Sequence, residues 1–205
     1  MAPRPERAVL RERYDRRQAA VLLAAARVFA QRGYGQTSVP ELADALGIAT
    51  GSLYHYFGGK EQLLIGICDQ LMDPLLADAR RLDASEDPPD VKLRALVRRW
   101  VAHVIEHRDH MLVFQQERHA IEHGNQWRKV RESRKQFERL VESVIRSAHD
   151  QGMTRIEDTR LTLAALLGMV NYTAQWHRRR GRLTPEEIAD GYLALVLAEV
   201  AESRP

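Results

Sequence analysis

Residues 37–64 (TSVPELADALGIATGSLYHYFGGKEQLL) restrict the possible folds more than any other stretch of the chain. Apolar side chains recur there every three or four residues, at Val39, Leu42, Ala43 and Leu46. This spacing gives a short helix one apolar face, and Gly47 follows where a left-handed residue ends a helix. A second short run, residues 50–57, turns Leu53 and Phe57 inward. Two short helices joined by a glycine turn form the helix-turn-helix pattern.

The second of these helices has a composition suited to contact with DNA. It begins with small and hydroxyl-bearing residues, so its backbone can approach a phosphate and its free N–H groups can point at the anion. Tyrosine hydroxyls and a histidine edge follow, and these groups can reach phosphates or base edges in the major groove. We therefore expect this helix to enter the major groove through Thr50, Gly51, Ser52, Tyr54, His55 and Tyr56. Phosphate contacts are expected from Thr37, Ser38 and Lys60.

The same stretch resembles the recognition pattern of the TetR family of one-component regulators. The matching residues are Thr37, Leu42, Ala43, Leu46, Gly47, Ile48, Ala49, Gly51, Leu53, Tyr54, Tyr56, Phe57, Lys60, Glu61 and Leu63. One position departs from the family, because Ala49 stands where the family usually has the serine that caps the recognition helix. We expect Thr50 to provide the cap one residue later. A short helical hairpin without a DNA role is the alternative interpretation.

Positive charge is concentrated at the N-terminal end of the chain. Residues 1–60 contain nine Lys or Arg against five Asp or Glu, within a net charge of +3 for the whole sequence. Most of the excess comes from Arg4, Arg7, Arg11, Arg13, Arg16 and Arg17. We expect residues 1–14 to form a flexible basic arm and Arg17 to contact DNA. A solvated tail and an arm that becomes ordered only on DNA both fit this composition.

The bulk composition fits an intracellular regulator. Hydrophobic residues make up 44% of the 205 residues, which suffices for real cores. The single cysteine, Cys68, cannot form an internal disulfide, and its apolar neighbours predict a packed thiol. No apolar run reaches the length of a membrane span or marks a signal peptide. We therefore expect a soluble, cytoplasmic protein with no membrane contact and no cofactor.

The remaining sequence shows only helical periodicity, so we predict an all-α fold of about nine helices in two domains. The first helix is expected from about Asp15 to Gln31, within a three-helix DNA-binding domain of residues 15–60. Residues 61–205 are expected to form a helical domain for ligand binding and dimerisation. Pro74 should kink or break the helix that joins the two domains, because its ring removes one hydrogen bond and clashes with the preceding turn. A single short helix is expected near residues 110–122.

The last two helices carry small residues at helical spacing. The final helix opens with Thr-Pro-Glu-Glu at residues 184–187, a capping box with proline in its first turn. Small residues let a second helix approach closely, which suits a four-helix interface between two copies. The predicted interface comprises Ala164, Ala165, Gly168, Gly191, Ala194, Leu195 and Ala198. A monomer that buries these stripes internally is the alternative. A dimer supplies two copies of the DNA-binding domain of residues 15–60, which we call the reading head, and a pseudo-palindromic operator needs two of them.

Two histidine spacings also match a catalytic motif. Residues 103–107 (HVIEH) and 119–123 (HAIEH) fit the H-x-x-E-H pattern of inverted zinc metalloproteases. A chain with eight histidines produces so short a pattern readily, no third ligand is indicated, and the intervening Val104, Ile105 and Ile121 fit ordinary helix packing. We therefore expect neither a metal site nor enzymatic activity, although a helical metalloenzyme remains one alternative function.

The resemblance to the TetR family implies an effector pocket in the second domain. The expected lining is Leu71, Leu75, Trp100, Phe114, Met169, Asn171, Tyr172 and Trp176. Packing in the core of the domain is the alternative for these side chains. Residues 168–195 look like the corresponding segment of TetR regulators that respond to acyl-CoA thioesters, and Arg178, Arg179 and Arg180 can meet phosphates or simply offset a helix dipole.

Together these features predict a DNA-binding transcriptional regulator, in the form of a homodimeric repressor that a small hydrophobic effector, possibly an acyl-CoA thioester, releases from its operator. A dimeric ligand-binding module that no longer binds double-stranded DNA is the other alternative.

Overall fold

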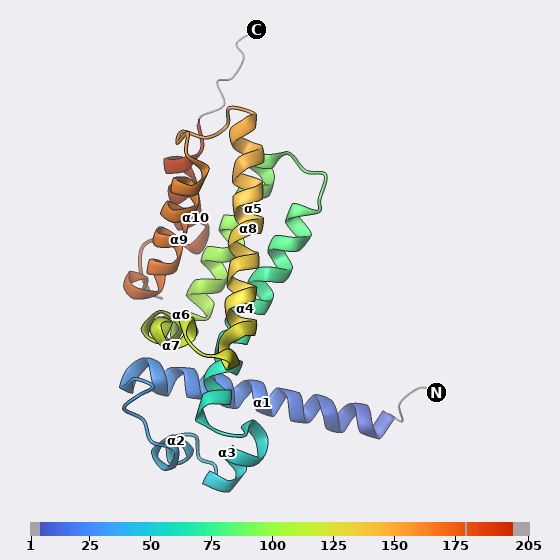
Figure 1. The fold of residues 1–205 in the computed structure, drawn as a ribbon, viewed down its shortest axis with the longest axis vertical. Helices are drawn as coiled ribbons and strands as arrows, with labels where there is room; N and C mark the ends of the chain where they lie inside the picture. Colours follow the sequence, from blue (N-terminus) through green and yellow to red (C-terminus); the bar gives the residue numbers. More distant parts are fainter. Residues whose placement is uncertain (1–4, 179, 199–205) are drawn as a thin grey trace.

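The computed structural model describes residues 5–178 and 180–198, and this part of the chain contains no β-strand, only one isolated bridge between Thr154 and Leu197 (Figure 1). The helices are α1 (Pro5–Arg32), α2 (Val39–Ala45), α3 (Thr50–Phe57), α4 (Lys60–Asp83), α5 (Pro89–Glu106), α6 (Arg108–Gln116), α7 (Arg118–Glu122), the 3-10 turn η1 (Asn125–Trp127), α8 (Arg128–Asp150), α9 (Thr159–Trp176) and α10 (Pro185–Val196). The predicted all-α fold is therefore confirmed.

The helices form two layers that meet at α1. In Figure 1, α1 crosses the lower end of a vertical bundle formed by α4, α5, α8, α9 and α10, and α2 and α3 lie below α1. The short helices α6 and α7 lie between the bundle and α1. Helix α4 begins beside α3 and extends into the bundle, so this one helix belongs to both layers.

Local signals in the sequence place the ends of the short helices. Gly47 has φ of +63°, the left-handed conformation that the turn between α2 and α3 requires. Capping boxes begin α2 at Ser38 and α10 at Thr184, and the second of these was predicted. The predicted cap of α3 is wrong: Thr50 is the first helical residue, Ala49 occupies the cap position, and no described side chain caps this helix.

The structure corrects three expectations about the helices. The first helix begins at Pro5 and not near Asp15, because proline at a first helical position is followed by a run rich in Arg, Glu, Ala and Leu. Residues 5–14 of the predicted flexible arm are therefore helical, and residues 1–4 lie outside the described part of the chain. The helix joining the layers is not broken at Pro74, because buried leucines on both sides of it, Leu71 and Leu75, pack into one core.

The expected helix near residues 110–122 is two helices. α6 ends at Gln116, the backbone turns at Glu117, and α7 begins at Arg118. The described residues thus hold ten α-helices where about nine were expected.

Two buried clusters form the core. The larger fills the bundle and includes Trp100, whose ring packs edge-on against Phe137 with centroids 4.9 Å apart. The smaller lies among α1, α2, α3 and the start of α4, and it contains Cys68 as expected. Burial, with help from the nearby carboxylates of Asp69 and Glu117, raises the pKa of the Cys68 thiol to about 12.

Candidate nucleic-acid interface and bundle cavity

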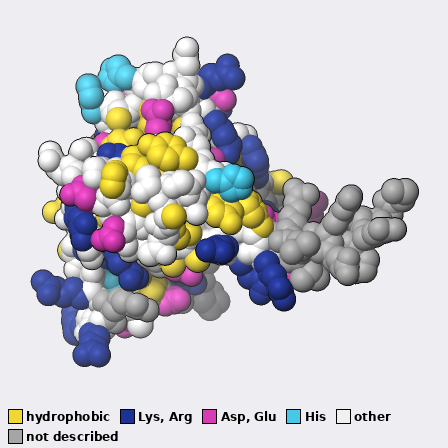
Figure 2. All heavy atoms as spheres, turned by 90° about the horizontal axis from the view of Figure 1, so that it is seen from below, with side chains coloured by type: hydrophobic (Ala, Val, Ile, Leu, Met, Phe, Trp, Pro, Cys, Tyr) yellow, Lys and Arg dark blue, Asp and Glu magenta, His cyan; other side chains and the backbone are white. Residues whose placement is uncertain are grey.

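The outer face of α3 is polar, aromatic and open to solvent. Thr50, Gly51 and His55 are exposed, and Tyr54 leaves 52% of its surface accessible. The opposite face buries Leu53 and Phe57 against α1 and α4, which fixes the direction of the exposed side chains. Figure 2 looks at this end of the molecule and shows Lys and Arg side chains along the edges, with hydrophobic side chains between them.

Aromatic contacts connect α1 to α3. Tyr56 is half-buried, and its ring centroid lies 5.4 Å from that of Tyr14 on α1. The guanidinium carbon of Arg17 lies 5.9 Å from the centroid of the same ring, and the His55 ring is 5.4 Å away. Arg17 is itself exposed, so α1 presents a cation beside α3.

Two of the residues predicted to bind phosphates are used by the fold instead. Thr37 is only 1% exposed, and its hydroxyl donates a hydrogen bond to the carbonyl oxygen of Gly33 at 2.8 Å. Ser38 is exposed, but its hydroxyl donates to Glu41 Oε2 at 2.6 Å within the capping box of α2. Thr37 is thereby excluded from a phosphate contact, because its side chain is buried and its hydroxyl is already engaged.

Lys60 is also turned inward. Its ammonium group donates to the carbonyl oxygens of Tyr34 and Thr37, each at 2.6 Å, and lies 4.2 Å from the centroid of the Tyr34 ring. Burial lowers the pKa of Lys60, and the Glu117 carboxylate partly opposes this effect. The predicted phosphate contact is corrected to a structural role: Lys60, at the start of α4, holds the loop between α1 and α2.

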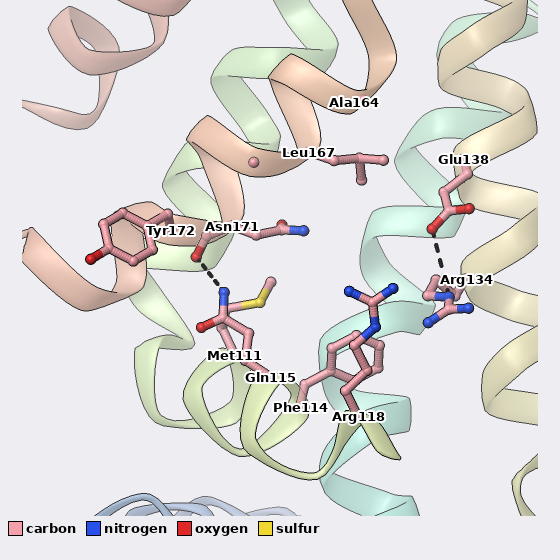
Figure 3. Close-up of a pocket in the computed structure, with 11 residues that line it drawn as sticks. Met111, Phe114, Gln115, Arg118, Arg134, Glu138, Ala164, Leu167, Asn171 and Tyr172 are labelled. Carbon is pink, nitrogen blue, oxygen red and sulfur yellow. Dashed lines mark hydrogen bonds and ion pairs between the residues drawn. The ribbon is translucent and has the colours of Figure 1, made fainter. Parts of the chain in front are cut away.

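A cavity of about 490 Å³ opens among α6, α8 and α9, and we call it the bundle cavity (Figure 3). Its lining is Met111, Phe114, Gln115, Arg118, Arg134, Glu138, Ala164, Leu167, Gly168, Asn171 and Tyr172. Figure 3 shows the side chains of Leu167 and Asn171 from α9 facing Arg134 and Glu138 of α8 across the space, with Phe114 and Arg118 below.

Six of the eleven residues that line the bundle cavity have polar side chains, and the charged ones belong to α7 and α8. The Arg134 side chain is only 20% exposed, and it pairs with Glu138 at 3.6 Å and with Glu122 at 3.3 Å. Glu122 also binds Arg118 at 3.2 Å, so two guanidinium groups share one outer carboxylate. Asn171 Oδ1 is buried and has no hydrogen-bond partner among the described residues, which leaves one acceptor unsatisfied in an otherwise apolar wall.

The predicted lining residues separate into three groups. Phe114, Asn171 and Tyr172 line the bundle cavity. Leu71, Leu75 and Trp100 do not, because their helical phase buries them in the bundle core, and Met169 packs partly buried against that core. Trp176 lines a separate hollow of about 210 Å³ together with Arg178. Of the arginines expected at the pocket mouth, Arg180 is exposed, and Arg179 lies outside the described residues.

Arg118 and Arg134 were missed by the sequence analysis. Arg134 lies between Val130 and Phe137 at the spacing of the buried face of α8, which could have marked it as enclosed, whereas no periodic signal distinguishes Arg118 from a solvated side chain. They come together only through the packing of α7 against α8, sixteen positions apart.

The small-residue stripes of α9 and α10 lie on the surface. Ala164, Gly168, Gly191 and Ala194 are exposed, whereas Ala165 is partly buried and Ala198 follows the end of α10. Large apolar side chains continue this surface, because Tyr172 and Leu195 are each 62% exposed. The stripes are therefore not buried within this chain.

The histidine pairs make ordinary helix contacts. His103 Nε2 hydrogen-bonds the Leu71 carbonyl oxygen at 3.0 Å, and the rings of His103 and His107 stack at 4.1 Å. His123 Nδ1 hydrogen-bonds the His119 carbonyl oxygen at 2.8 Å. Within the described residues, no group of three or more His, Cys, Asp or Glu side chains is placed to hold a metal ion.

Comparison with known proteins gives matches across nearly the whole chain. Residues 21–67 match the family model of bacterial regulatory proteins of the tetR family, and residues 86–200 match that of the tetracyclin repressor-like C-terminal domain. The HTH-type transcriptional repressor KstR2 of Mycobacterium tuberculosis is 27% identical over 187 residues, which cover 91% of this chain and 94% of that protein. KstR2 of Rhodococcus jostii is 29% identical, covering 90% of this chain and 91% of that protein.

Solved structures show the same similarity. The ketosteroid transcriptional regulator KstR2 of Mycobacterium tuberculosis matches with a TM-score of 0.81 at 26% identity, covering 89% of this chain and 96% of that one. AibR in complex with isovaleryl coenzyme A and operator DNA matches with a TM-score of 0.75 at 31% identity, covering 87% and 97%. No described helix is both long and apolar enough to cross a membrane.

The contacts of Lys60 lead to a stability prediction. Lys60→Met keeps the length of the side chain but removes both hydrogen bonds to the α1–α2 loop, so we expect the free energy of unfolding to fall by about 2 kcal/mol. The matched control is Lys129→Met, because Lys129 is exposed and holds Asp69 at 2.7 Å. For Lys129→Met, the fall in the free energy of unfolding should stay below about 1 kcal/mol. Urea unfolding at one protein concentration measures both, and equal losses would contradict the structural role of Lys60.

Proposed function

The chain belongs to the TetR family of bacterial regulatory proteins, and from this premise we propose that it is a dimeric transcriptional repressor that a small effector releases from its operator. The observation that carries the proposal is the outer face of α3, where a helix start without a side-chain cap stands beside exposed Tyr54 and His55. Such a repressor works on chromosomal DNA, and hence in the bacterial cytoplasm. KstR2, which is similar along almost the whole chain, is described as a transcriptional repressor.

The proposed DNA contacts follow from the position of each side chain. An uncapped helix start leaves backbone N–H groups for a phosphate, and exposed Gly51 allows the close approach. Thr50, Ser52, Tyr54 and His55 then face the major groove. Arg17 and Tyr56 are proposed to contact DNA at the edge of this surface, because the Arg17 guanidinium lies over the Tyr56 ring of α3.

Tyr54→Ala should strongly weaken specific operator binding without unfolding the protein. Tyr54 is half exposed and packs little, whereas a lost base contact costs about 1–3 kcal/mol, or roughly tenfold to a hundredfold in affinity. The assay is a gel shift with a DNA sequence that the wild-type protein has selected from a random pool. Leu183→Ala, another exposed apolar side chain, is the control. Retained affinity in Tyr54→Ala would remove Tyr54 from the interface, and selection of no sequence at all would favour a ligand-binding module without a DNA role.

Two copies of the chain are proposed to meet through α9 and α10. Their exposed surface combines small residues with Tyr172 and Leu195, a contiguous type of apolar surface that monomers seldom expose. A twofold axis at this surface makes a four-helix interface and provides two reading heads for a pseudo-palindromic operator.

Leu195→Arg should convert the dimer to a monomer, because a charged side chain would be buried against its symmetry mate. The side chain is exposed within one chain, so the fold should persist. Val91→Arg, a substitution of an exposed apolar residue on α5, is the control and should leave the dimer intact. Sedimentation equilibrium measures both masses, and a dimeric Leu195→Arg protein would place the interface elsewhere.

The bundle cavity is proposed to hold the effector. Its apolar walls suit an acyl group, while Arg118 and Arg134 offer guanidinium groups that match phosphate geometry. The related AibR was crystallised with isovaleryl coenzyme A, which supports an acyl-CoA thioester as the ligand class. Helix α6 lines this cavity through Met111 and Phe114 and also packs on α1, so occupation can shift the reading head and weaken DNA binding.

Release of the DNA complex tests the effector. We expect isovaleryl-CoA or a longer acyl-CoA to dissociate the preformed complex, and free coenzyme A or the free acid to fail. Arg118→Gln should raise the thioester concentration needed by about tenfold, the cost of one charge-assisted contact. Arg81→Gln, on the bundle surface away from the cavity, is the matched control. A complex that survives every thioester would discard this ligand class while leaving the DNA-binding role intact.

A further inference from the structure

Three histidine rings lie in contact where α4, α5 and α6 meet, and we call His103, His107 and His110 the histidine stack. His103 lies in the last turn of α5, His107 joins the two helices, and His110 lies in the first turn of α6. The rings of His103 and His107 are stacked with centroids 4.1 Å apart, and the ring of His110 meets that of His107 edge-on at 5.4 Å. His110 lies outside both H-x-x-E-H motifs, so those motifs did not reveal this cluster.

Each ring of the histidine stack makes one hydrogen bond. His103 Nε2 lies 3.0 Å from the carbonyl oxygen of Leu71, and His110 Nε2 lies 3.0 Å from Oε1 of Gln70, so both rings hold α4. His107 Nδ1 lies 3.2 Å from the carbonyl oxygen of His103. Because all three oxygens are acceptors, the ring nitrogens that face them carry the protons, and the other nitrogen of each ring has a lone pair. The geometry therefore fits three neutral rings.

A second proton on His110 would have no acceptor. The residue is 1% exposed, and its Nδ1 has no hydrogen-bond partner among the described residues. Protonation there would bury both a positive charge and an unpaired N–H donor, which raises the free energy of the folded state. Burial, with the neighbouring His107 and His103, accordingly lowers the pKa of His110 to about 4.

The charged groups around the histidine stack do not compensate a charge on it. They are Asp69, Asp73 and Asp78 of α4, Glu106 of α5, Arg108 and Asp109 of α6, Arg27 of α1 and the titratable His177 after α9. Each of the four aspartates already forms a salt bridge with a Lys or Arg side chain. Burial and His107 lower the pKa of His103 by more than its hydrogen bond to α4 and the carboxylates of Glu106 and Asp78 raise it.

We propose that the histidine stack makes the attachment of α6 to the bundle acid-sensitive, so that protonation of its rings loosens the contact of α6 with α4 and, through α6, the seating of α1. Helix α6 lies between the bundle and α1 in Figure 1, and it packs on both α4 and α1. Two charged rings at the 4.1 Å spacing of His103 and His107 would also repel each other.

The consequence for DNA rests on the proposed repressor function. Tyr14 and Arg17 of α1 contact the ring of Tyr56 in α3, so a displaced α1 changes the position of α3. The operator complex should therefore weaken as the pH falls, without any ligand in the bundle cavity.

The direction of the pH dependence follows from the lowered pKa of His110. A histidine in the unfolded chain has a pKa of about 6.5, so between about pH 6.5 and pH 4 the unfolded chain binds a proton that the folded protein does not. Stability is therefore full above about pH 6.5 and falls as the pH decreases toward 4. One such group changes the unfolding equilibrium constant by roughly tenfold per pH unit within this window.

Urea unfolding of the full-length protein between pH 7 and pH 5, at one protein concentration, tests the histidine stack. Carboxylates titrate mostly below this window, so histidines dominate the change. We expect the unfolding equilibrium constant of the wild type to rise roughly tenfold from pH 6 to pH 5. His110→Gln keeps a donor for Gln70 but takes up no proton, so most of this rise should disappear. His149→Gln removes a hydrogen-bonded histidine of α8 outside the stack, and this control should keep the pH dependence of the wild type.

His103→Gln is the second variant, and it decides the question if His110→Gln does not fold. It too keeps a donor, here for the carbonyl oxygen of Leu71, and it should reduce the pH dependence in the same direction. A wild-type stability that does not change from pH 7 to pH 5 would overturn the proposal. So would a pH dependence that is the same in the wild type and in the folded glutamine variants of the stack.

Operator affinity at pH 7 and pH 5.5 tests the connection to α3. Acid adds positive charge elsewhere, for example at the exposed His55, and this alone strengthens attraction to phosphates. We expect the opposite result, a complex that is weaker at pH 5.5 by about fivefold or more and that His110→Gln restores. A complex that tightens equally in both proteins would overturn the connection from the stack to α3. Absence of specific binding at pH 7 would instead contradict the repressor function, while the urea experiment, which contains no DNA, still decides the stack itself.

Discussion

The contact between α1 and α4 at Gly66 is the point on which the two layers depend. A Cβ atom at Gly66 would stand 2.9 Å from Cδ2 and 3.2 Å from Cδ1 of Leu22, so any other residue there would displace the Leu22 side chain from its present position. The reading head is thereby seated directly on the bundle, and its core is not self-contained: it also includes Val113 of α6 and Val130 of α8. The predicted domain boundary at residue 60 divides the chain in sequence, but the smaller core contains residues from both sides of that boundary.

Because of this shared core, α6 faces several surfaces at once. His110 lies at the hollow between α1 and α4, Met111 and Phe114 line the bundle cavity, and Val113 belongs to the core of the reading head. Asp109 of the same helix lies 3.9 Å from Arg27 of α1. A helix of nine residues cannot shift at one of these surfaces without moving the others, since close-packed interiors transmit displacement. The proposed coupling between an effector and the orientation of α3 therefore needs no long pathway.

The helices could be predicted from the sequence because their signals are local. The spacing of Leu42 and Leu46, the left-handed Gly47 and the capping box of Thr184 each act within one or two turns, and all three are seen in the structure. The side chains whose partners are distant in sequence could not be predicted. Lys60 reaches back to Tyr34 and Thr37, and Arg134 meets Glu122 only after α7 and α8 have packed. Family resemblance led to the proposal that the outer face of α3 contacts DNA, and that face is exposed, but it gave no sign that Lys60 donates to the backbone of the α1–α2 loop.

The buried thiol of Cys68 has a practical consequence for measuring motion. It is the single cysteine of the sequence, it lies inside the core of the reading head, and its pKa of about 12 keeps it protonated. Since the thiolate is the form that attacks thiol reagents, this residue is inert while the protein stays folded. A cysteine introduced on the exposed face of α2 or α3 would therefore be the one reactive position per chain. In the proposed dimer, paired fluorophores or spin labels at this position would report the separation of the two α3 helices directly, in a protein that needs no prior removal of native cysteines.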